Sequence, residues 1–145
     1  MNTLLEAKKL SRYFIRGSET VKALHELDLT LNKGQIISIV GRSGSGKTTF
    51  LNQVGCLDTP TSGSLKIDGI EVTSLKEKEL VEFRRNNIGF IFQLFYLIPT
   101  ISVYENVELP LVFARKRDRK KVLEALDIVG LADKRHFLPK QLNGG

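Results

Sequence analysis

The residue types that could do chemistry are concentrated in one stretch, GRSGSGKTT, which runs from Gly41 to Thr49. It matches the pattern G-x-x-x-x-G-K-[S/T] found in loops that hold a phosphate chain. Gly41, Gly44 and Gly46 can adopt backbone angles that other residues avoid, so the chain can close around an anion. We therefore predict a phosphate-binding loop here.

The pattern also predicts a role for each part of the loop. The N–H groups from Ser43 to Thr48 should point inward, as an anion site at the start of the following helix. Lys47 should neutralise the β and γ phosphates, and the Thr48 hydroxyl should bind Mg²⁺, while Thr49 can donate near the α phosphate. The predicted nucleotide-binding set is Gly41, Arg42, Ser43, Gly44, Ser45, Gly46, Lys47, Thr48 and Thr49.

A strand and a helix must position such a loop. The β-branched run QIISIV (residues 35–40) predicts a strand buried on both faces, and a helix should follow from Thr48 to about Gly55. IGFIF (residues 88–92) predicts a second buried strand. Strands that alternate with helices after residue 35 favour an α/β fold with a partial, largely parallel core sheet. The first thirty residues predict a separate antiparallel strand pair.

Helix signals continue along the chain. Residues 73–87 predict a helix with capping-box spacing between Ser74 and Glu77, and the same spacing recurs at Ser102 and Glu105. Pro110 should kink or end the second of these helices. Residues 120–131 predict a last amphipathic helix, with Gly130 as its C-cap.

The charge and cysteine content limit the classes of partner and compartment that suit the chain. The 22 basic and 16 acidic residues give a net charge of +6, which suits an anionic ligand, a nucleic acid or a membrane surface, or reflects only an unbalanced surface. The dense basic run at residues 115–121 is typical of a solvated linker or helix face. Because no basic stripe carries interleaved aromatics, we expect no nucleic-acid partner. The lone Cys56 predicts a buried thiol in a reducing compartment.

With the loop placed, the flanking residues resemble one family. The motifs of the nucleotide-binding subunit of ATP-binding-cassette (ABC) transporters occur here in order and cover essentially the whole chain. They lie in YFIRGSETVKALHELDLTLNKGQIISIVG (13–41), QVGCLDTPTSGSLKIDG (53–69), IGFIFQLFYLIPTISVYENVELPL (88–111) and LPKQLNGG (138–145). The segment FYLIPTISVYENVELPL is most similar to the lipoprotein-release and macrolide-exporter branch of the family.

The resemblance implies ATP and Mg²⁺ as ligands, with a nucleotide-binding core over about 1–93 and a helical subdomain over about 94–145. In the family, an aromatic near the N-terminus stacks on adenine. Adjacent strand residues face opposite sides, so only one of Tyr13 and Phe14 can do this, and the spacing to Gly17 favours Phe14. Both can also be ordinary strand aromatics. By resemblance, Gln93 contacts Mg²⁺ and the attacking water, and it joins Lys47 as a catalytic residue.

The resemblance also implies partners. The apolar stretch Leu94–Ile98 suggests a docking surface for the coupling helix of a membrane permease, which would hold the chain on the cytoplasmic face of the membrane. The family forms dimers, in which the signature motif contacts ATP on the opposite subunit. Asn143, Gly144 and Gly145 resemble that motif, although Asn143 stands where the family usually has Ser.

The family's domain is longer than this chain and carries further residues that hydrolyse ATP. No apolar run here ends in an acidic pair, and neither His25 nor His136 is placed as the family's switch His. We therefore expect a fragment or truncated product, and two functions stay open. One is an ATP-binding subunit that energises a permease; the other is a nucleotide-binding fragment without hydrolysis. The glutamine loop and the LNGG ending argue against a small-molecule kinase.

Overall fold

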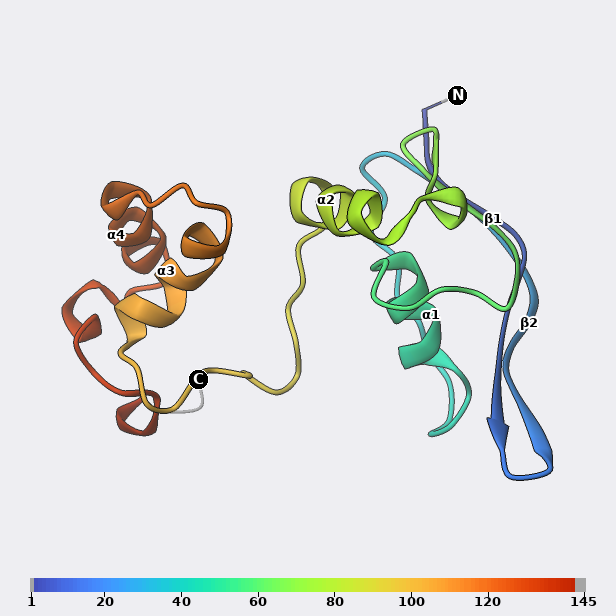
Figure 1. Ribbon diagram of the computed structural model, residues 1–145, viewed down its shortest axis with the longest axis horizontal. Helices are drawn as coiled ribbons and strands as arrows, with labels where there is room; N and C mark the ends of the chain where they lie inside the picture. Colours follow the sequence, from blue (N-terminus) through green and yellow to red (C-terminus); the bar gives the residue numbers. More distant parts are fainter. Residues whose placement is uncertain (1, 143–145) are drawn as a thin grey trace. The chain divides into compact units, whose positions relative to one another are not determined.

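The computed structural model describes residues 2–142, and the chain divides into two compact units, Met1–Ile91 and Phe92–Gly145 (Figure 1). The elements of the first unit are β1 (Thr3–Arg16), β2 (Glu19–Asn32), α1 (Lys47–Val54), β3 (Ser62–Ile67), β4 (Ile70–Glu71), a 3-10 turn (Val72–Ser74) and α2 (Glu77–Asn87). Those of the second are α3 (Val103–Phe113), α4 (Arg119–Ile128) and two 3-10 turns (Ala132–Lys134 and Pro139–Gln141).

The sheet of the first unit has the order β2-β1-β3-β4, and all its pairs are antiparallel. The long hairpin of β1 and β2 confirms the predicted N-terminal strand pair. Its turn contains Gly17 at φ 61°, a left-handed conformation that favours glycine.

The two segments predicted as buried strands do not form strands in this structure. Residues 35–40 and 88–92 run without sheet pairing. Ile36, Val40 and Ile91 are 100%, 86% and 104% exposed. The prediction was wrong for these elements because a strand buried on both faces needs a neighbour on each side. Among the described residues, the four-stranded sheet contains neither segment.

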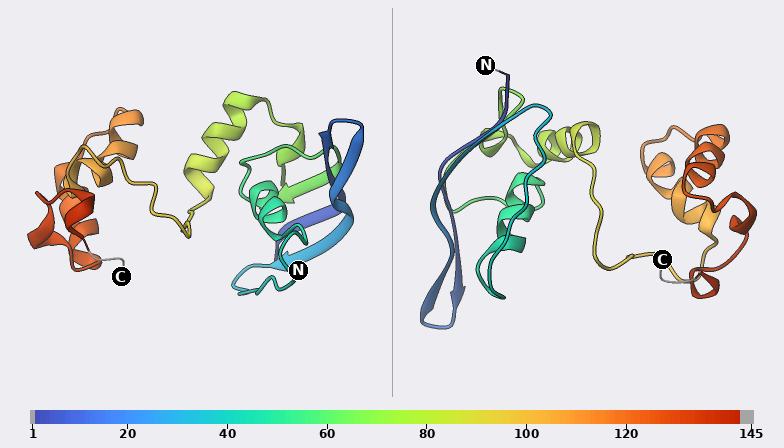
Figure 2. Two further views of the ribbon diagram at one scale, coloured as in Figure 1. Left: turned by 90° about the horizontal axis from the view of Figure 1, so that it is seen from below. Right: turned by 180° about the vertical axis from the view of Figure 1, so that it is seen from behind.

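The core of the first unit lies between the sheet and the two helices, and Figure 2 shows α1 and α2 on the same side of the sheet. Its buried members are Leu5, Ala7, Leu10, Cys56, Leu65, Val72 and Phe83. The buried thiol confirms the prediction for Cys56. Burial also raises the pKa of that thiol, although the nearby Arg84 opposes the shift.

Helix α2 begins later than its sequence predicts. The Ser74 hydroxyl donates to the carbonyl of Glu71 at 2.8 Å and takes part in the 3-10 turn, so the predicted pairing of Ser74 with Glu77 is wrong. Instead, the N–H of Lys76 donates to the Glu79 carboxylate at 2.8 Å, and the helix starts at Glu77.

The second predicted capping box is confirmed. The Ser102 hydroxyl accepts from the N–H of Glu105 at 3.2 Å, and the Glu105 carboxylate accepts from the N–H of Ser102 at 2.7 Å. Hydrogen bonds from the Ser102 side chain and backbone lower the pKa of Glu105. Helix α3 does not end at Pro110 but continues to Phe113, so the proline lies in its last turn.

Helix α4 ends as predicted. Gly130 has φ 69°, its N–H donates to Asp127 at 2.9 Å, and the N–H of Leu131 donates to Leu126 at 2.8 Å. These two bonds form a Schellman motif, which satisfies carbonyls at the helix end. The α3–α4 pair packs around Val103, Val122 and Leu126.

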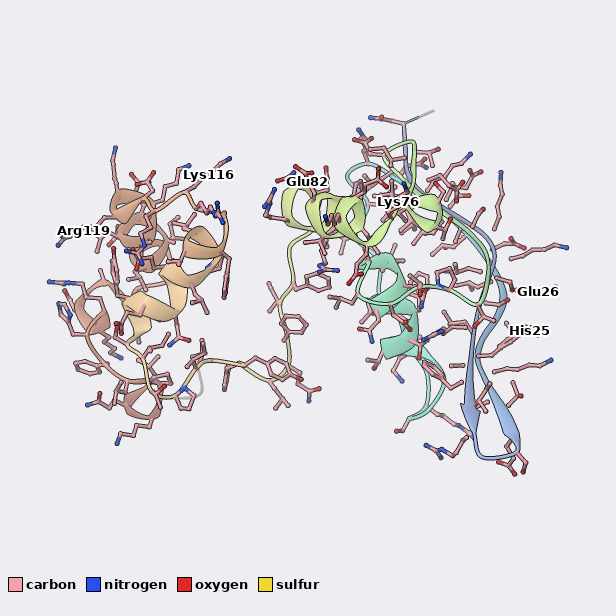
Figure 3. All side chains as sticks on the ribbon, in the orientation of Figure 1. His25, Glu26, Lys76, Glu82, Lys116 and Arg119 are labelled. Carbon is pink, nitrogen blue, oxygen red and sulfur yellow. The ribbon has the colours of Figure 1, made fainter. Side chains whose placement is uncertain are left out.

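The basic run at residues 115–121 forms the exposed connection from α3 and the first turn of α4. Figure 3 shows Lys116 and Arg119 on this part of the unit. This confirms its interpretation as a solvated linker and helix face.

Asn106, on α3, fixes the irregular segment that precedes its helix. Its side-chain oxygen accepts from the N–H of Ile98 at 2.8 Å. Its amide nitrogen lies 3.1, 3.2 and 3.0 Å from the carbonyls of Ile98, Ile101 and Ser102. One side chain therefore substitutes for secondary structure over residues 98–102, because backbone groups that leave water need partners.

We expect Asn106→Ala to lower the free energy of unfolding of the second unit by about 1–3 kcal/mol, because it removes the partners of several backbone groups. Thermal denaturation and hydrogen exchange at the Ile98 amide measure the effect. Asn86→Ala, at an exposed position on α2, is the matched control and should change stability by less than about 0.5 kcal/mol. Equal effects of the two substitutions would contradict this role.

Candidate functional site: the loop at the start of helix α1

The predicted phosphate loop lies directly at the N-terminus of α1. The helix begins at Lys47, within one residue of its predicted start, and its first bond joins the N–H of Phe50 to the carbonyl of Gly46 at 2.8 Å. The first N–H groups of a helix have no partner within it, and they carry the positive end of its dipole. Gly41 to Ser45 are exposed, as is Thr48. The loop is thus exposed at the N-terminal end of the helix, with the N–H of Ser45 bonded to the Arg42 carbonyl at 3.2 Å.

Gly46 holds the loop against the sheet. It has φ 88°, and a Cβ atom at this position would lie 2.3 Å from the backbone oxygen of Ala23 on β2. Gly44 has a similar φ of 79°, but a Cβ atom there would have open space around it. Glycine is therefore required at Gly46 by close approach as well as by conformation, and at Gly44 by conformation alone.

A glycine also lies in a close contact at the far end of α1. A Cβ atom on Gly55 would lie 2.5 Å from the ring of Phe90, in the segment that leads out of the first unit. Helix α1 is therefore held by one glycine contact at each end.

Lys47 folds back over the loop that precedes it. Its ammonium donates to the carbonyls of Gly41 and Arg42 at 2.9 and 2.7 Å and lies 3.5 Å from the Ser45 hydroxyl. A lysine ammonium has three donors, and each has a partner here. A phosphate that contacts Lys47 must replace at least one of these bonds.

An apolar groove of about 520 Å³ lies beside the loop. It is lined by Leu24, Leu27, Leu29, Leu31, Ile37, Ser38, Ile39, Val40, Ser45, Lys47 and Phe50. The groove lies between β2 and the segment 35–40, which is outside the sheet. That segment was predicted to be a strand buried on both faces, but its side toward β2 lines an open groove.

The two candidate aromatics lie on opposite faces of the hairpin. Tyr13 pairs with Lys22, and its hydroxyl is 2.7 Å from Nδ1 of His25, whose position on β2 is labelled in Figure 3. Phe14 is 41% exposed and shares a face with Arg12, which pairs with Leu24. Leu24 also lies beside Gly46. Phe14 thus lies on the face of the hairpin that carries the loop.

Sequence reasoning missed Arg12 and Asp58. The Arg12 guanidinium lies 4.6 Å from the centre of the Phe14 ring, and its Nε donates to Asp58 at 2.8 Å. An Arg two residues before an aromatic on a strand predicts that the two share a face. Nothing local in the sequence predicts the partner 46 residues away.

Gln93 and the segment after it belong to the second unit. Gln93 is exposed, and its role at the phosphate loop stays a prediction. Leu94, Phe95, Tyr96, Leu97 and Ile98 are all exposed, between 40% and 73%. The stretch is therefore exposed and apolar, as a docking surface would need to be, and its role in docking stays a prediction. Asn143, Gly144 and Gly145 lie outside the described residues.

Comparison with known proteins agrees with this geometry. Residues 24–145 match the ABC transporter family. The chain is 41% identical to the uncharacterized ABC transporter ATP-binding protein YknY of Bacillus subtilis (strain 168), over 98% of this chain and 63% of the relative. It is 46% identical to the macrolide export ATP-binding/permease protein MacB of Rhodopseudomonas palustris (strain HaA2), over 97% of this chain and 22% of the relative.

A solved structure is similarly close. The ATP-binding cassette MJ0796, in a dimeric post-hydrolysis state bound to ADP and Pi, is 41% identical, with a TM-score of 0.85 over 97% of this chain and 64% of that one. A loop that can cradle phosphates, on an α/β fold of this kind, defines a nucleotide-binding domain. The chain belongs to the ABC transporter family, which confirms both the resemblance and the predicted fold class. It spans less than two thirds of the length of these relatives.

The two loop glycines give a direct test of the close approach at Gly46. Gly44→Ala should cost about 1–2 kcal/mol of folding free energy, because only its left-handed conformation is strained. Gly46→Ala should cost about 1–3 kcal/mol more, because the added carbon meets a backbone oxygen that a side chain cannot move aside. Urea denaturation followed by circular dichroism measures both. Equal losses would show that the loop is not held against β2.

Proposed function

We propose that this chain binds ATP as the nucleotide-binding part of an ABC transporter, whose membrane permease it energises. The observation that carries the proposal is the Gly41–Thr49 loop, which lies at the N-terminus of α1 and over which the Lys47 ammonium folds. An anion there gains both charge-assisted hydrogen bonds and the helix dipole. The names of the relatives, which include ATP-binding and export proteins, support the same function.

The roles within the site follow from its donors. The amides from Ser43 to Thr48 bind the phosphates, and Lys47 exchanges a loop carbonyl for a β or γ phosphate oxygen. Phe14 stacks on adenine, since its ring lies on the loop side of the hairpin and is partly exposed. These assignments also include Arg42 and Thr49, whose places in the loop let them contact the same phosphates.

The loop fits Mg²⁺ through its donor set. Mg²⁺ is usually bound by one or two protein oxygens together with substrate phosphates and water. The exposed Thr48 hydroxyl at the first turn of α1 supplies one such oxygen. We propose Gln93 as a further ligand and catalytic residue, on the family's pattern alone. When bound, the ion supplies charge neutralisation between the phosphates.

Two protein partners belong to the proposal. The exposed stretch Leu94–Ile98 has the apolar character of a permease-docking surface, and docking would place the chain at the cytoplasmic face of the membrane. In the described part of the chain, no helix has the length and apolar character needed to cross a bilayer. The dimeric state of the similar cassette supports a homodimer, to which Asn143, Gly144 and Gly145 would contribute the signature contact.

A second function, nucleotide binding without turnover, is favoured by the sequence. No apolar run in these 145 residues ends in the acidic pair that would hold the metal and activate water. Phosphoryl transfer to water depends on positioning both.

Lys47→Ala tests nucleotide binding. We expect it to weaken Mg-ATP binding by about 10-fold to 100-fold, the effect of about 1.5–3 kcal/mol for a charged hydrogen bond. Isothermal titration calorimetry measures the change. Lys78→Ala, an exposed lysine on α2, removes the same charge away from the loop and should leave affinity within about twofold. A folded wild-type chain that binds no ATP would overturn the proposal.

Turnover distinguishes the two functions. We expect purified residues 1–145 to release phosphate from Mg-ATP no faster than the Lys47→Ala variant does. A continuous phosphate assay at saturating ATP provides the measurement. Steady release that disappears in the variant would show that these residues hydrolyse ATP by themselves.

A further inference from the structure

The Phe14 ring is supported from one side by a charged side chain. The Arg12 guanidinium carbon lies 4.6 Å from the ring centre, within the range of cation–π attraction. Two residues on the same strand face thus form a stacked pair, and Phe14 remains 41% exposed. The ring is therefore partly accessible to a planar ligand while Arg12 lies over it.

Arg12 is itself held in place. Its Nε donates to the Asp58 carboxylate at 2.8 Å, and both side chains are about three quarters covered, with 25% and 24% exposure. Partial burial strengthens such a pair relative to one in open solvent. The guanidinium is planar and its direction is set by this bond, so Asp58 determines how Arg12 lies on the ring.

Asp58 connects the pair to the phosphate-binding helix. Its Oδ2 also accepts from Nε2 of Gln53 at 3.1 Å, and Gln53 lies on α1 with 1% exposure. The N–H of Asp58 reaches the carbonyl of Asn52 at 3.3 Å. The carboxylate therefore joins the helix that starts at the loop to the strand that carries Phe14.

The loop after Asp58 is bonded to the same strand. The Thr61 N–H donates to the carbonyl of Ser11 at 2.8 Å, and the Thr61 hydroxyl accepts from the N–H of Tyr13 at 3.0 Å. These bonds flank Arg12 on both sides. They limit movement of the strand at the position where the stacked pair sits.

We propose that Arg12, anchored by Asp58 and Gln53, is a positioning residue that holds the Phe14 ring ready to stack on the nucleotide base. The inference rests on the proposed ATP-binding function and adds residues to it. A ring fixed before binding loses less side-chain entropy when the base arrives, so its contact yields more affinity. The same chain of hydrogen bonds, from Arg12 through Asp58 to Gln53, fixes the position of the base contact relative to the phosphate contacts on α1.

The experiment compares ATP with inorganic tripolyphosphate, which has the phosphates but no base. In Arg12→Gln, ATP affinity should fall by about threefold to tenfold, whereas tripolyphosphate affinity should stay within about twofold. Asp58→Asn leaves the Arg12 charge in place but loosens it, and it should shift the same ratio in the same direction. Arg12→Lys keeps the charge and should recover part of the ATP affinity.

A double-mutant cycle separates positioning from general effects. If Arg12 acts through the ring, Arg12→Gln should have no further effect on ATP affinity in the Phe14→Ala background. Tyr13→Phe removes the hydroxyl bonded to His25 on the opposite face and is the matched control, with no expected change. If Arg12→Gln fails to give a sheet signal in circular dichroism, Asp58→Asn takes its place in the cycle.

Three outcomes overturn the inference. They are an unchanged ATP affinity in Arg12→Gln, an equal loss for ATP and tripolyphosphate, and an equal loss with and without the Phe14 ring. In each case a wild-type chain that still binds ATP leaves the proposed function standing. A folded wild-type chain that binds neither ligand would remove both.

Discussion

The structure of the first unit depends on the contact between Gly46 and the backbone of Ala23. A side chain could not fit there, since its first carbon would lie 2.3 Å from a carbonyl oxygen. Two backbones that approach this closely fix the start of α1 relative to the hairpin. The loop, the aromatic face of the hairpin and the apolar groove are consequences of that placement, because each lies where β2 and α1 meet.

Each unit is stabilised by its own packing, and the packing differs between them. In the first, a sheet covered by α1 and α2 buries a continuous apolar cluster. In the second, a smaller cluster joins α3 and α4, and Asn106 substitutes for regular structure over the preceding segment. The surface between residues 94 and 98 is therefore irregular but anchored at Ile98, so its apolar side chains face solvent from a backbone tied to α3.

Local sequence signals predicted the elements that depend on local chemistry. The N-terminal strand pair, the start of α1, the cap at Ser102 and Glu105 and the stop at Gly130 all agree with the structure. The predicted cap at Ser74 is not formed, because the Glu79 carboxylate accepts from the N–H of Lys76 and the helix starts later.

Features that depend on distant residues were not predictable in the same way. The segments 35–40 and 88–92 have the composition of buried strands, but composition cannot show whether a neighbour pairs with them. Within the site, the glycine pattern predicted the loop at the start of α1, and spacing favoured Phe14, which shares a hairpin face with Arg12 and Leu24. The carboxylate that orients Arg12 comes from a loop 46 residues later, and only the fold brings the two together.

The contact between Gly55 and Phe90 has a mechanical consequence. The ring packs so closely on the C-terminal end of α1 that one added carbon on Gly55 would lie 2.5 Å from it, so a displacement of Phe90 would change the packing at that end of the helix. Phe90 lies three residues before Gln93, in the segment that follows α2. The helix that begins at the phosphate loop therefore ends against a residue of the connecting segment, so a substitution that enlarges Gly55 would disturb the packing of both.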